Sequence, residues 1–242
     1  MRILKGITLA ALVALPVAGF AGEAATNTVW KNSVALGATY KDGNTEKSLF
    51  TMTLKGDRYA EKSDWLNNLY AEYGKTEGDQ TEGQLRGQSD YRYKFGGGNF
   101  FGGGFGEAYY DDMKGIRTRL KLGPDTGYYF INKETMKFDT SIGLNWVYER
   151  TTAREHDFVE CRVAANYLWD FTETASYYFN IEYSANVEDT NDGNGLLATG
   201  LKTKVSDQLS LFVELRDEYD NTPDPDVDHN DITLTAGLAY DF

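Results

Sequence analysis

Hydrophobic and polar side chains alternate along most of this chain. Between residues 84 and 95 the even positions are Gln, Arg, Gln, Asp, Arg and Lys, and the odd positions are Leu, Gly, Ser, Tyr, Tyr and Phe. The same period of two runs through residues 136–149 and 232–242. Successive side chains of a β-strand point to opposite faces, so this period predicts strands with one polar and one less polar face.

Weaker alternation fills the rest of the chain. The further predicted strands are residues 30–40, 46–59, 65–73, 100–110, 117–130, 158–169, 175–185, 196–205 and 209–219. The total is about twelve strands of about ten residues each, the length that a tilted strand needs to cross a bilayer. The predicted fold is all-β, a transmembrane antiparallel up-and-down β-barrel. Its even strand number places both termini on the same rim.

The predicted connectors alternate in length. Short turns at 61–63, 96–99, 171–173 and 206–208 interleave with longer, more acidic links at 41–45, 76–82, 111–116, 150–156, 187–195 and 220–231. Short turns on one rim and longer loops on the other are typical of outer-membrane barrels, whose short-turn rim faces the periplasm.

Two segments fit the alternation poorly. Pro124 cannot donate a ladder hydrogen bond, which predicts either a bulge at 123–125 or two shorter strands in place of 117–130. The glycine-rich stretch 96–106 weakens the prediction of the strand that it enters, because glycine has no side chain to pack on either face.

The cost of a charge in lipid indicates which faces line the lumen. A Lys or Arg that faces lipid near the midplane costs about 2–4 kcal/mol. The polar faces are therefore predicted to point inward, and the predicted lumen-lining residues are Arg86, Arg92, Lys94, Arg117, Arg119, Lys121, Glu160, Arg162, Glu182 and Glu214. Aromatic residues near the strand ends, such as Trp30, Trp146 and Trp169, suit interfacial girdles on the outer face.

The N-terminus carries an export signal. Arg2 and Lys5 precede an apolar run at 7–17, and small residues at 19 and 21 occupy the −3 and −1 positions of a cleavage site. This layout predicts a signal peptide over residues 1–21 and a single barrel domain over residues 22–242.

The C-terminus favours the membrane over a soluble alternative. Alternation alone fits equally a secreted β-sandwich or a lipocalin-like barrel with its apolar faces inward. The last predicted strand, however, ends in Tyr240 and Phe242, which resembles the terminal signature that the barrel-assembly machinery reads in bacterial outer-membrane proteins. Together with the connector lengths and the signal peptide, this ending predicts the bacterial outer membrane.

Composition narrows the classes of partner. The chain has 24 Lys and Arg against 37 Asp and Glu, a net charge of −13, which argues against nucleic acid because phosphate binding needs clustered cations. A single cysteine, Cys161, permits no internal disulfide, and it falls on an apolar, lipid-facing strand face. The expected partners are outer-membrane lipids, lipopolysaccharide and, during insertion, the barrel-assembly machinery. The protein is expected to be a monomer without a cofactor.

Three short segments resemble a known family. Residues 30–37 read WKNSVALG and are followed at 42–48 by DGNTEKS, and residues 122–129 read LGPDTGYY. These segments resemble the YdiY-like family of salt-induced outer-membrane proteins, with Gly43, Asn44 and Thr45 at the tip of its first hairpin. The resemblance implies an outer-membrane barrel of uncharacterised biochemical role. By themselves, Gly and Asn at this position indicate a hairpin turn.

Catalytic and metal-binding residues are scarce. The two histidines, His156 and His229, fall in predicted loops without a serine in an adjacent strand position, which argues against an outer-membrane hydrolase. Carboxylates are the ligands of hard cations, and weak candidates for such a site are Asp224, Asp226, Asp228 and Asp231. Residues 189–195 lack the register and the closing Glu of a calcium loop.

Three functions follow from this reading. The first is a narrow porin or small-solute channel with a charged lumen, and the second is a closed barrel with a structural or stress-related role in the envelope. An outer-membrane lipid-modifying enzyme is the third. Barrels of about eight strands fill themselves with side chains and those of sixteen or more form channels, so a count of about twelve does not choose between the first two.

Overall fold

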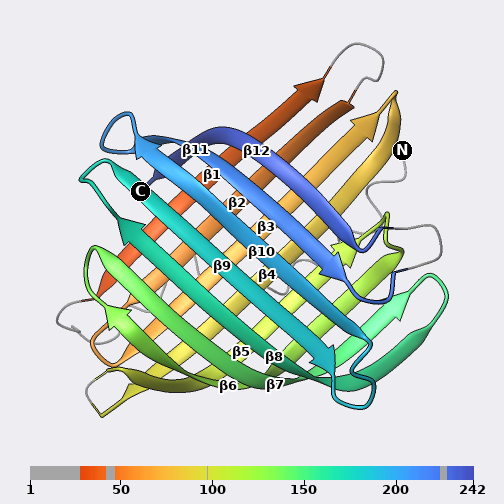
Figure 1. Ribbon diagram of the computed structural model, residues 1–242, viewed down its shortest axis with the longest axis horizontal. Coiled ribbons are helices and arrows are strands. Elements are labelled where there is room, and N and C mark those ends of the chain that lie inside the picture. The colour runs from red at the N-terminus through yellow and green to blue at the C-terminus, as the bar shows by residue number, and fades with distance from the viewer. Residues whose placement is uncertain (1–27, 42–46, 97, 224–227) are drawn as a thin grey trace.

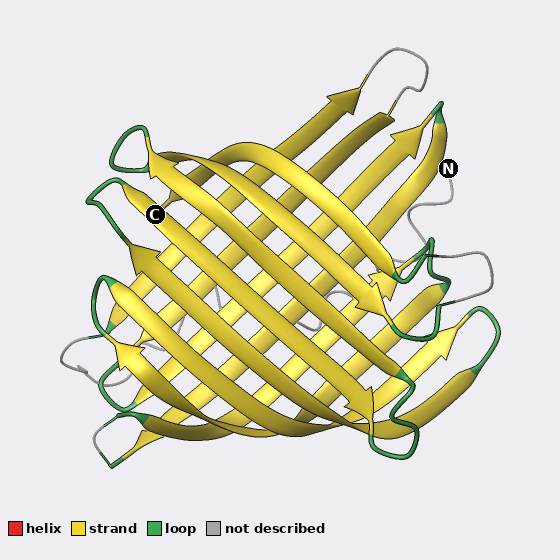
Figure 2. Ribbon diagram, viewed as in Figure 1, coloured by secondary structure: helices red, strands yellow, loops and turns green. Residues whose placement is uncertain are grey.

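The described residues form a closed antiparallel barrel. The computed structural model describes residues 28–41, 47–96, 98–223 and 228–242. The predicted signal peptide, 1–21, and the hairpin tip Gly43, Asn44 and Thr45 lie outside the described residues. Each strand pairs with its neighbours in sequence, and β1 pairs with β12 to close the sheet (Figures 1 and 2). The up-and-down barrel expected from the alternation is confirmed.

Twelve strands are present in the described part of the chain. They are β1 (Val29–Lys41), β2 (Lys47–Tyr59), β3 (Ser63–Thr76), β4 (Asp79–Phe95), β5 (Phe100–Asp111), β6 (Ile116–Asn132), β7 (Met136–Thr151), β8 (Glu155–Asp170), β9 (Ala175–Asn186), β10 (Gly193–Lys204), β11 (Leu209–Asp220) and β12 (Asn230–Asp241). Among the described residues no helix is long and apolar enough to cross a membrane.

The connectors are less uneven than the sequence predicted. The link expected at 76–82 is strand for most of its length, because β3 continues to Thr76 and β4 begins at Asp79. Only Glu77 and Gly78 form the turn, with φ angles of 54° and 90°. Such a two-residue turn with both φ angles positive matches the twist of a hairpin. Among the fully described connectors, the longest that remains is the one after β9, residues 187–192.

Pro124 interrupts the sheet less than predicted. The expected bulge, or break into two strands, is wrong: β6 is continuous, and Leu122–Trp146 and Asp125–Gly143 lie in the same register on either side of the proline. Around the proline, pairing with β7 drops out at Gly123 and Pro124, while Pro124 remains opposite Gly104 of β5. The backbone N–H that Pro124 lacks is therefore tolerated without a change of register between β6 and β7 at this point.

The glycines of β5 permit a close approach between strands. A Cβ atom at Gly103 would lie 1.7 Å from the backbone oxygen of Tyr91 on β4. Only glycine fits there, so the glycine run that weakened the strand prediction in fact allows β5 to pair with β4 along the whole of β5.

The distribution of side chains is inverted relative to a soluble protein. Large apolar residues such as Leu122, Phe50 and Leu144 are 67%, 59% and 54% exposed, whereas Arg92 and Glu160 are buried. Buried charges and a continuous apolar exterior are what a bilayer around a polar lumen requires. A sandwich or lipocalin-like barrel with inward apolar faces does not fit this arrangement.

Candidate functional site: the charged interior of the barrel

Charged side chains meet across the barrel interior. Arg86 on β4 contacts Glu182 on β9 at 3.0 Å, and Gln84 on β4 donates to Glu218 on β11 at 2.9 Å. These strands are not neighbours in the closed sheet, so their side chains reach one another only through the interior. The lumen is therefore bridged at this level.

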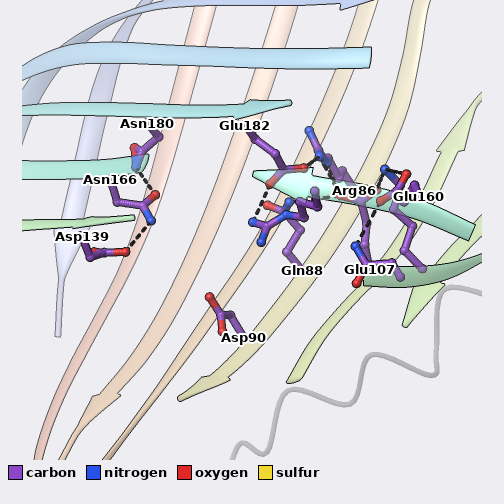
Figure 3. Close-up of polar contacts among 12 residues, drawn as sticks. Arg86, Gln88, Asp90, Glu107, Asp139, Glu160, Asn166, Asn180 and Glu182 are labelled. Carbon is purple, nitrogen blue, oxygen red and sulfur yellow. Dashed lines mark hydrogen bonds and ion pairs between the residues drawn. The ribbon is translucent and has the colours of Figure 1, made fainter. Parts of the chain in front are cut away.

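Six residues form a central cluster at this level: Arg86, Glu107, Lys121, Glu160, Arg162 and Glu182. Figure 3 labels four of them, Arg86, Glu107, Glu160 and Glu182. Arg86 lies 2.7 Å from Glu107, and Arg162 lies 2.7 Å from Glu182. Lys121 is 3.0 Å from Glu160. Three cations and three carboxylates balance, so each buried charge has a partner. Buried ions are tolerated only when they are paired and hydrogen-bonded in this way.

A second group, the turn-side cluster, lies nearer the rim where β1 begins and β12 ends. It consists of Asp64, Asp90, Arg92, Lys94, Tyr129 and Asp139. Arg92 bridges Asp90 at 2.8 Å and Asp139 at 3.0 Å, and the hydroxyl of Tyr129 donates to Asp64 at 2.8 Å. Lys94 also donates to the carbonyl oxygen of Ala60 in the turn between β2 and β3, which ties this cluster to the rim.

A third group, the loop-side cluster, lies towards the opposite rim. It consists of Gln84, Lys114, Arg119, Glu149, Arg216 and Glu218. Glu218 collects contacts from Lys114 at 3.1 Å and Arg216 at 3.0 Å. Burial by itself lowers the pKa of Lys114, but the carboxylates of Glu218 and Asp111 outweigh it and hold that pKa above its usual value. Lys114 therefore remains a cation at the mouth of the barrel.

Aromatic rings stack against three arginines of the interior. The guanidinium of Arg162 lies 3.9 Å from the ring centroid of Phe105, and that of Arg216 lies 4.1 Å from Tyr70. Arg92 stacks similarly on Phe101, at 4.6 Å. Stacking on a ring face fixes the plane of a guanidinium and stabilises its charge where little water reaches it. The arginines are thus held rigidly.

A cavity of about 210 Å³ lies inside the barrel. Its walls come from β2, β3 and β4 on one side and from β8 to β11 on the other, with Phe105 of β5 between them. Asn180 donates to Asn166, which donates to Asp139, and this amide chain lines part of the wall (Figure 3). The cavity can hold several water molecules or one small polar solute.

The structure places all but one of the predicted lumen-lining residues in the interior. Arg86, Arg92, Lys94, Arg119, Lys121, Glu160, Arg162, Glu182 and Glu214 are buried or half-buried there, and each has a contact in one of the three clusters or, for Glu214, with the hydroxyl of Tyr178. Arg117 is the exception. The register shifts between Ile116 and Thr118, so Arg117 leaves the inward phase and its side chain is 48% exposed beside Asp112.

Several interior residues were missed from the sequence. The carboxylates Glu107 and Glu218 and the rings of Phe101 and Phe105 are all inside the barrel. The sequence reasoning assigned aromatic residues to the outer face, and the glycines around Phe105 concealed the period. The positions 101, 105, 107 and 109 share one face of β5, and that phase was the available signal.

Potential metal ligands do not cluster in the described part of the chain. The described residues contain no group of three or more His, Cys, Asp or Glu suited to a metal ion. Asp224 and Asp226 lie outside them, and Asp228 and Asp231 are exposed. His156 is the second residue of β8 and does not lie in a loop. Its side chain is 4.0 Å from Glu149, and the ring of His229 lies beside the backbone oxygen of Asp220.

The end of the chain lies on the outer surface. The rings of Tyr240 and Phe242 stack with centroids 6.2 Å apart and are 42% and 67% exposed. The backbone N–H of Phe242 donates to the carbonyl oxygen of Asn32, which fastens the end of β12 to β1.

Comparison with known proteins gives a family and a fold. The sequence profile of a family described as "Protein of unknown function, DUF481" matches residues 34–242. The match includes 42–48 and 122–129, so it agrees with the resemblance to the YdiY-like family. No curated protein shows a significant match.

Two solved outer-membrane proteins have a similar fold. The NanC porin aligns with a TM-score of 0.54 and 8% identity over 88% of this chain and 99% of its own. The COG4313 outer membrane channel from Pseudomonas putida F1 aligns with a TM-score of 0.52 and 10% identity over 93% of this chain and 100% of its own. Identities this low show a shared fold.

Proposed function

We propose that this chain, which belongs to the family described as "Protein of unknown function, DUF481", is a narrow outer-membrane channel for small polar solutes. The observation that carries the proposal is a cavity lined by amide, hydroxyl and charged groups inside a barrel with an apolar exterior. Polar linings of this kind set the selectivity of aqueous pores. The fold shared with the NanC porin and the COG4313 channel supports it.

The central cluster and the neighbouring contact between Gln84 and Glu218 of the loop-side cluster form the constriction of this channel. Arg86 and Glu182 close the distance between β4 and β9, and Gln84 and Glu218 do so between β4 and β11. Solutes pass by displacing or skirting these bridges, so the conductance is low. The channel should therefore discriminate little between cationic and anionic solutes, because every basic side chain at the constriction has a carboxylate beside it.

The proposal also covers the export of the protein, its insertion and its orientation in the outer membrane. The protein is exported by a cleaved signal peptide, inserted by the barrel-assembly machinery through the signature at Tyr240 and Phe242, and embedded as a monomer among outer-membrane lipids and lipopolysaccharide. The rim that carries both termini faces the periplasm. Its activity is passage of solutes and not a catalysed reaction.

Planar-bilayer recording of the refolded protein tests the channel. The wild type should give small, discrete current steps. The double variant Arg86→Ala, Glu182→Ala removes the bridge between β4 and β9 together with its charges, so its single-channel conductance should rise by about twofold or more. Arg117→Ala is the matched control, because it removes an exposed arginine from the rim, and its conductance should equal that of the wild type.

A closed barrel is the second candidate, and the cross-lumen bridges themselves favour it. A barrel whose interior is filled by ion pairs and rings can serve the envelope through its exposed rim alone. Current silence in both the wild type and the double variant, with folding confirmed by heat-modifiable gel mobility, would establish this alternative and exclude the channel.

A further inference from the structure

The cavity wall carries balanced charge. Its basic and acidic lining residues are Lys55, Arg92, Arg162 and Arg216 and Asp57, Asp90, Glu182 and Glu214. Five amide side chains complete the polar wall, namely Asn67, Asn68, Gln88, Asn166 and Asn180. An anion that enters meets four carboxylates and a cation meets four basic groups. Neither sign gains net Coulomb energy from the lining.

Three lining side chains from three strands keep buried polar atoms without a partner. Among the described residues, Oδ1 of Asn68 on β3, Oδ1 of Asp90 on β4, and Nε and Nη1 of Arg162 on β8 accept or donate no hydrogen bond. Asp90 is 8% and Arg162 is 6% exposed. Two acceptors and one pair of donors thus belong to side chains that line the cavity, and a buried polar group left unpaired is costly.

The rigidity of these groups suits a binding site. Asp90 is held through its other oxygen by Arg92 at 2.8 Å, and Arg162 is held by Glu182 at 2.7 Å and by the ring of Phe105. Their free atoms are therefore fixed in place before a ligand arrives. Preorganised donors and acceptors bind with less loss of side-chain entropy.

We propose that this cavity binds a neutral, hydroxyl-rich solute of about monosaccharide size. Hydroxyl groups both donate and accept, so one molecule can donate to Asn68 and Asp90 and accept from Arg162. A volume of about 210 Å³ corresponds to about seven water molecules at about 30 Å³ each, and a solute of that size replaces them. The inference rests on the proposed channel, which supplies the route to the cavity.

Binding to the refolded protein in detergent micelles tests the site without requiring conduction. Glucose, gluconate and choline are titrated separately and followed by ligand-detected NMR. Glucose should bind with a dissociation constant on the order of 1 mM, and both ions should bind at least about tenfold more weakly. Asn68→Leu should weaken glucose binding about tenfold, since it removes one acceptor and fills space. It breaks no hydrogen bond of the Asn68 side-chain oxygen found in the described residues.

A second variant and a control complete the experiment. Arg162→Lys keeps the charge beside Glu182 but removes the paired donors, so it should also weaken glucose binding about tenfold, whereas Arg117→Lys should leave it unchanged. Equal affinity in Asn68→Leu and the wild type, or gluconate or choline binding as tightly as glucose, would overturn the proposal.

The two proposals fail in different ways. Discrete conductance without any glucose binding removes the site, because the cavity then holds water only, and leaves the channel. Glucose binding without conductance removes the channel as a route and with it the reason for a solute in the cavity. The proposal stands when both are observed in the wild type and binding alone is lost in Asn68→Leu.

Discussion

At the scale of the residue, the interior depends on ion pairs between buried charges. Lys121 and Glu160 are 3% and 1% exposed and lie 3.0 Å apart. Their attraction offsets the cost of removing both from water, whereas one of them alone would remain an uncompensated charge. The contribution of the pair to the free energy of unfolding is therefore measured by removing one partner at a time and then both.

The pair predicts a non-additive stability effect. Glu160→Leu should destabilise the barrel by about 3–5 kcal/mol, because it leaves Lys121 buried with only the longer contact of 3.8 Å to Glu107. The double variant Lys121→Leu, Glu160→Leu should recover most of that loss, because it removes both charges. Urea unfolding of the protein in phospholipid vesicles measures both values. A double variant as unstable as the sum of the two single variants would contradict the argument.

At the scale of the element, glycine residues determine how closely neighbouring strands can approach each other. Gly103 and Gly104 are adjacent in β5 but have different surroundings. A Cβ at Gly103 would meet the backbone oxygen of Tyr91 at 1.7 Å, whereas one at Gly104 would meet nothing closer than the backbone oxygen of Gly123 at 3.7 Å. A backbone atom cannot turn aside as a flexible side chain can, so β4 would have to move.

This contrast gives a matched pair of substitutions. Gly103→Ala should lower the free energy of unfolding by about 1–3 kcal/mol, the usual cost of overpacking. Gly104→Ala should change it by less than about 0.5 kcal/mol, as surface substitutions generally do. Both variants add the same methyl group to neighbouring positions of one strand, so equal losses on urea unfolding would show that the close approach of β4 and β5 is not the cause.

The elements were predictable from the sequence to the extent that the period of two was visible. Each of the twelve strands overlaps a segment where polar and apolar side chains alternate, as in 84–95. Such alternation involves only residues close together in the sequence, so it can be recognised without the three-dimensional structure. The strand extensions into 76–82 were missed because Gly, Asp and Thr there look like loop residues, although Glu77 and Gly78 alone make the turn. Local composition does not report that cross-strand pairing continues.

The interior was predictable by face but not by partner. Alternation assigned Arg86 and Glu182 to inward faces, yet nothing in the sequence shows that strands β4 and β9 oppose each other. Arg117 was assigned wrongly because a register shift of one residue reverses the face. Such shifts depend on how the turn after β5 packs, which is information held by the three-dimensional structure.

At the scale of the whole molecule, the closure between β1 and β12 is the shortest ladder of the sheet. The two strands pair only over Ser33–Ala38 and Ala236–Asp241, whereas β1 pairs with β2 from Val29 to Lys41. Three of the six facing pairs contain only alanine or glycine, namely Ala35–Ala239, Gly37–Gly237 and Ala38–Ala236. A ladder with fewer hydrogen bonds and fewer side-chain contacts opens at lower cost than its neighbours. The barrel should therefore begin to unfold at this seam.

A disulfide across the seam tests this expectation. In a Cys161→Ala background, Ala38→Cys and Ala236→Cys lie opposite each other, and oxidation should raise the temperature at which heat-modifiable mobility is lost by on the order of 5 °C or more. The control joins Leu201→Cys to Val213→Cys, opposite each other in the longer ladder of β10 and β11. If the seam opens first, the control disulfide joins strands that separate later and should have a smaller effect. Equal shifts in the two oxidised variants would mean that the barrel opens without preference for its closing strands.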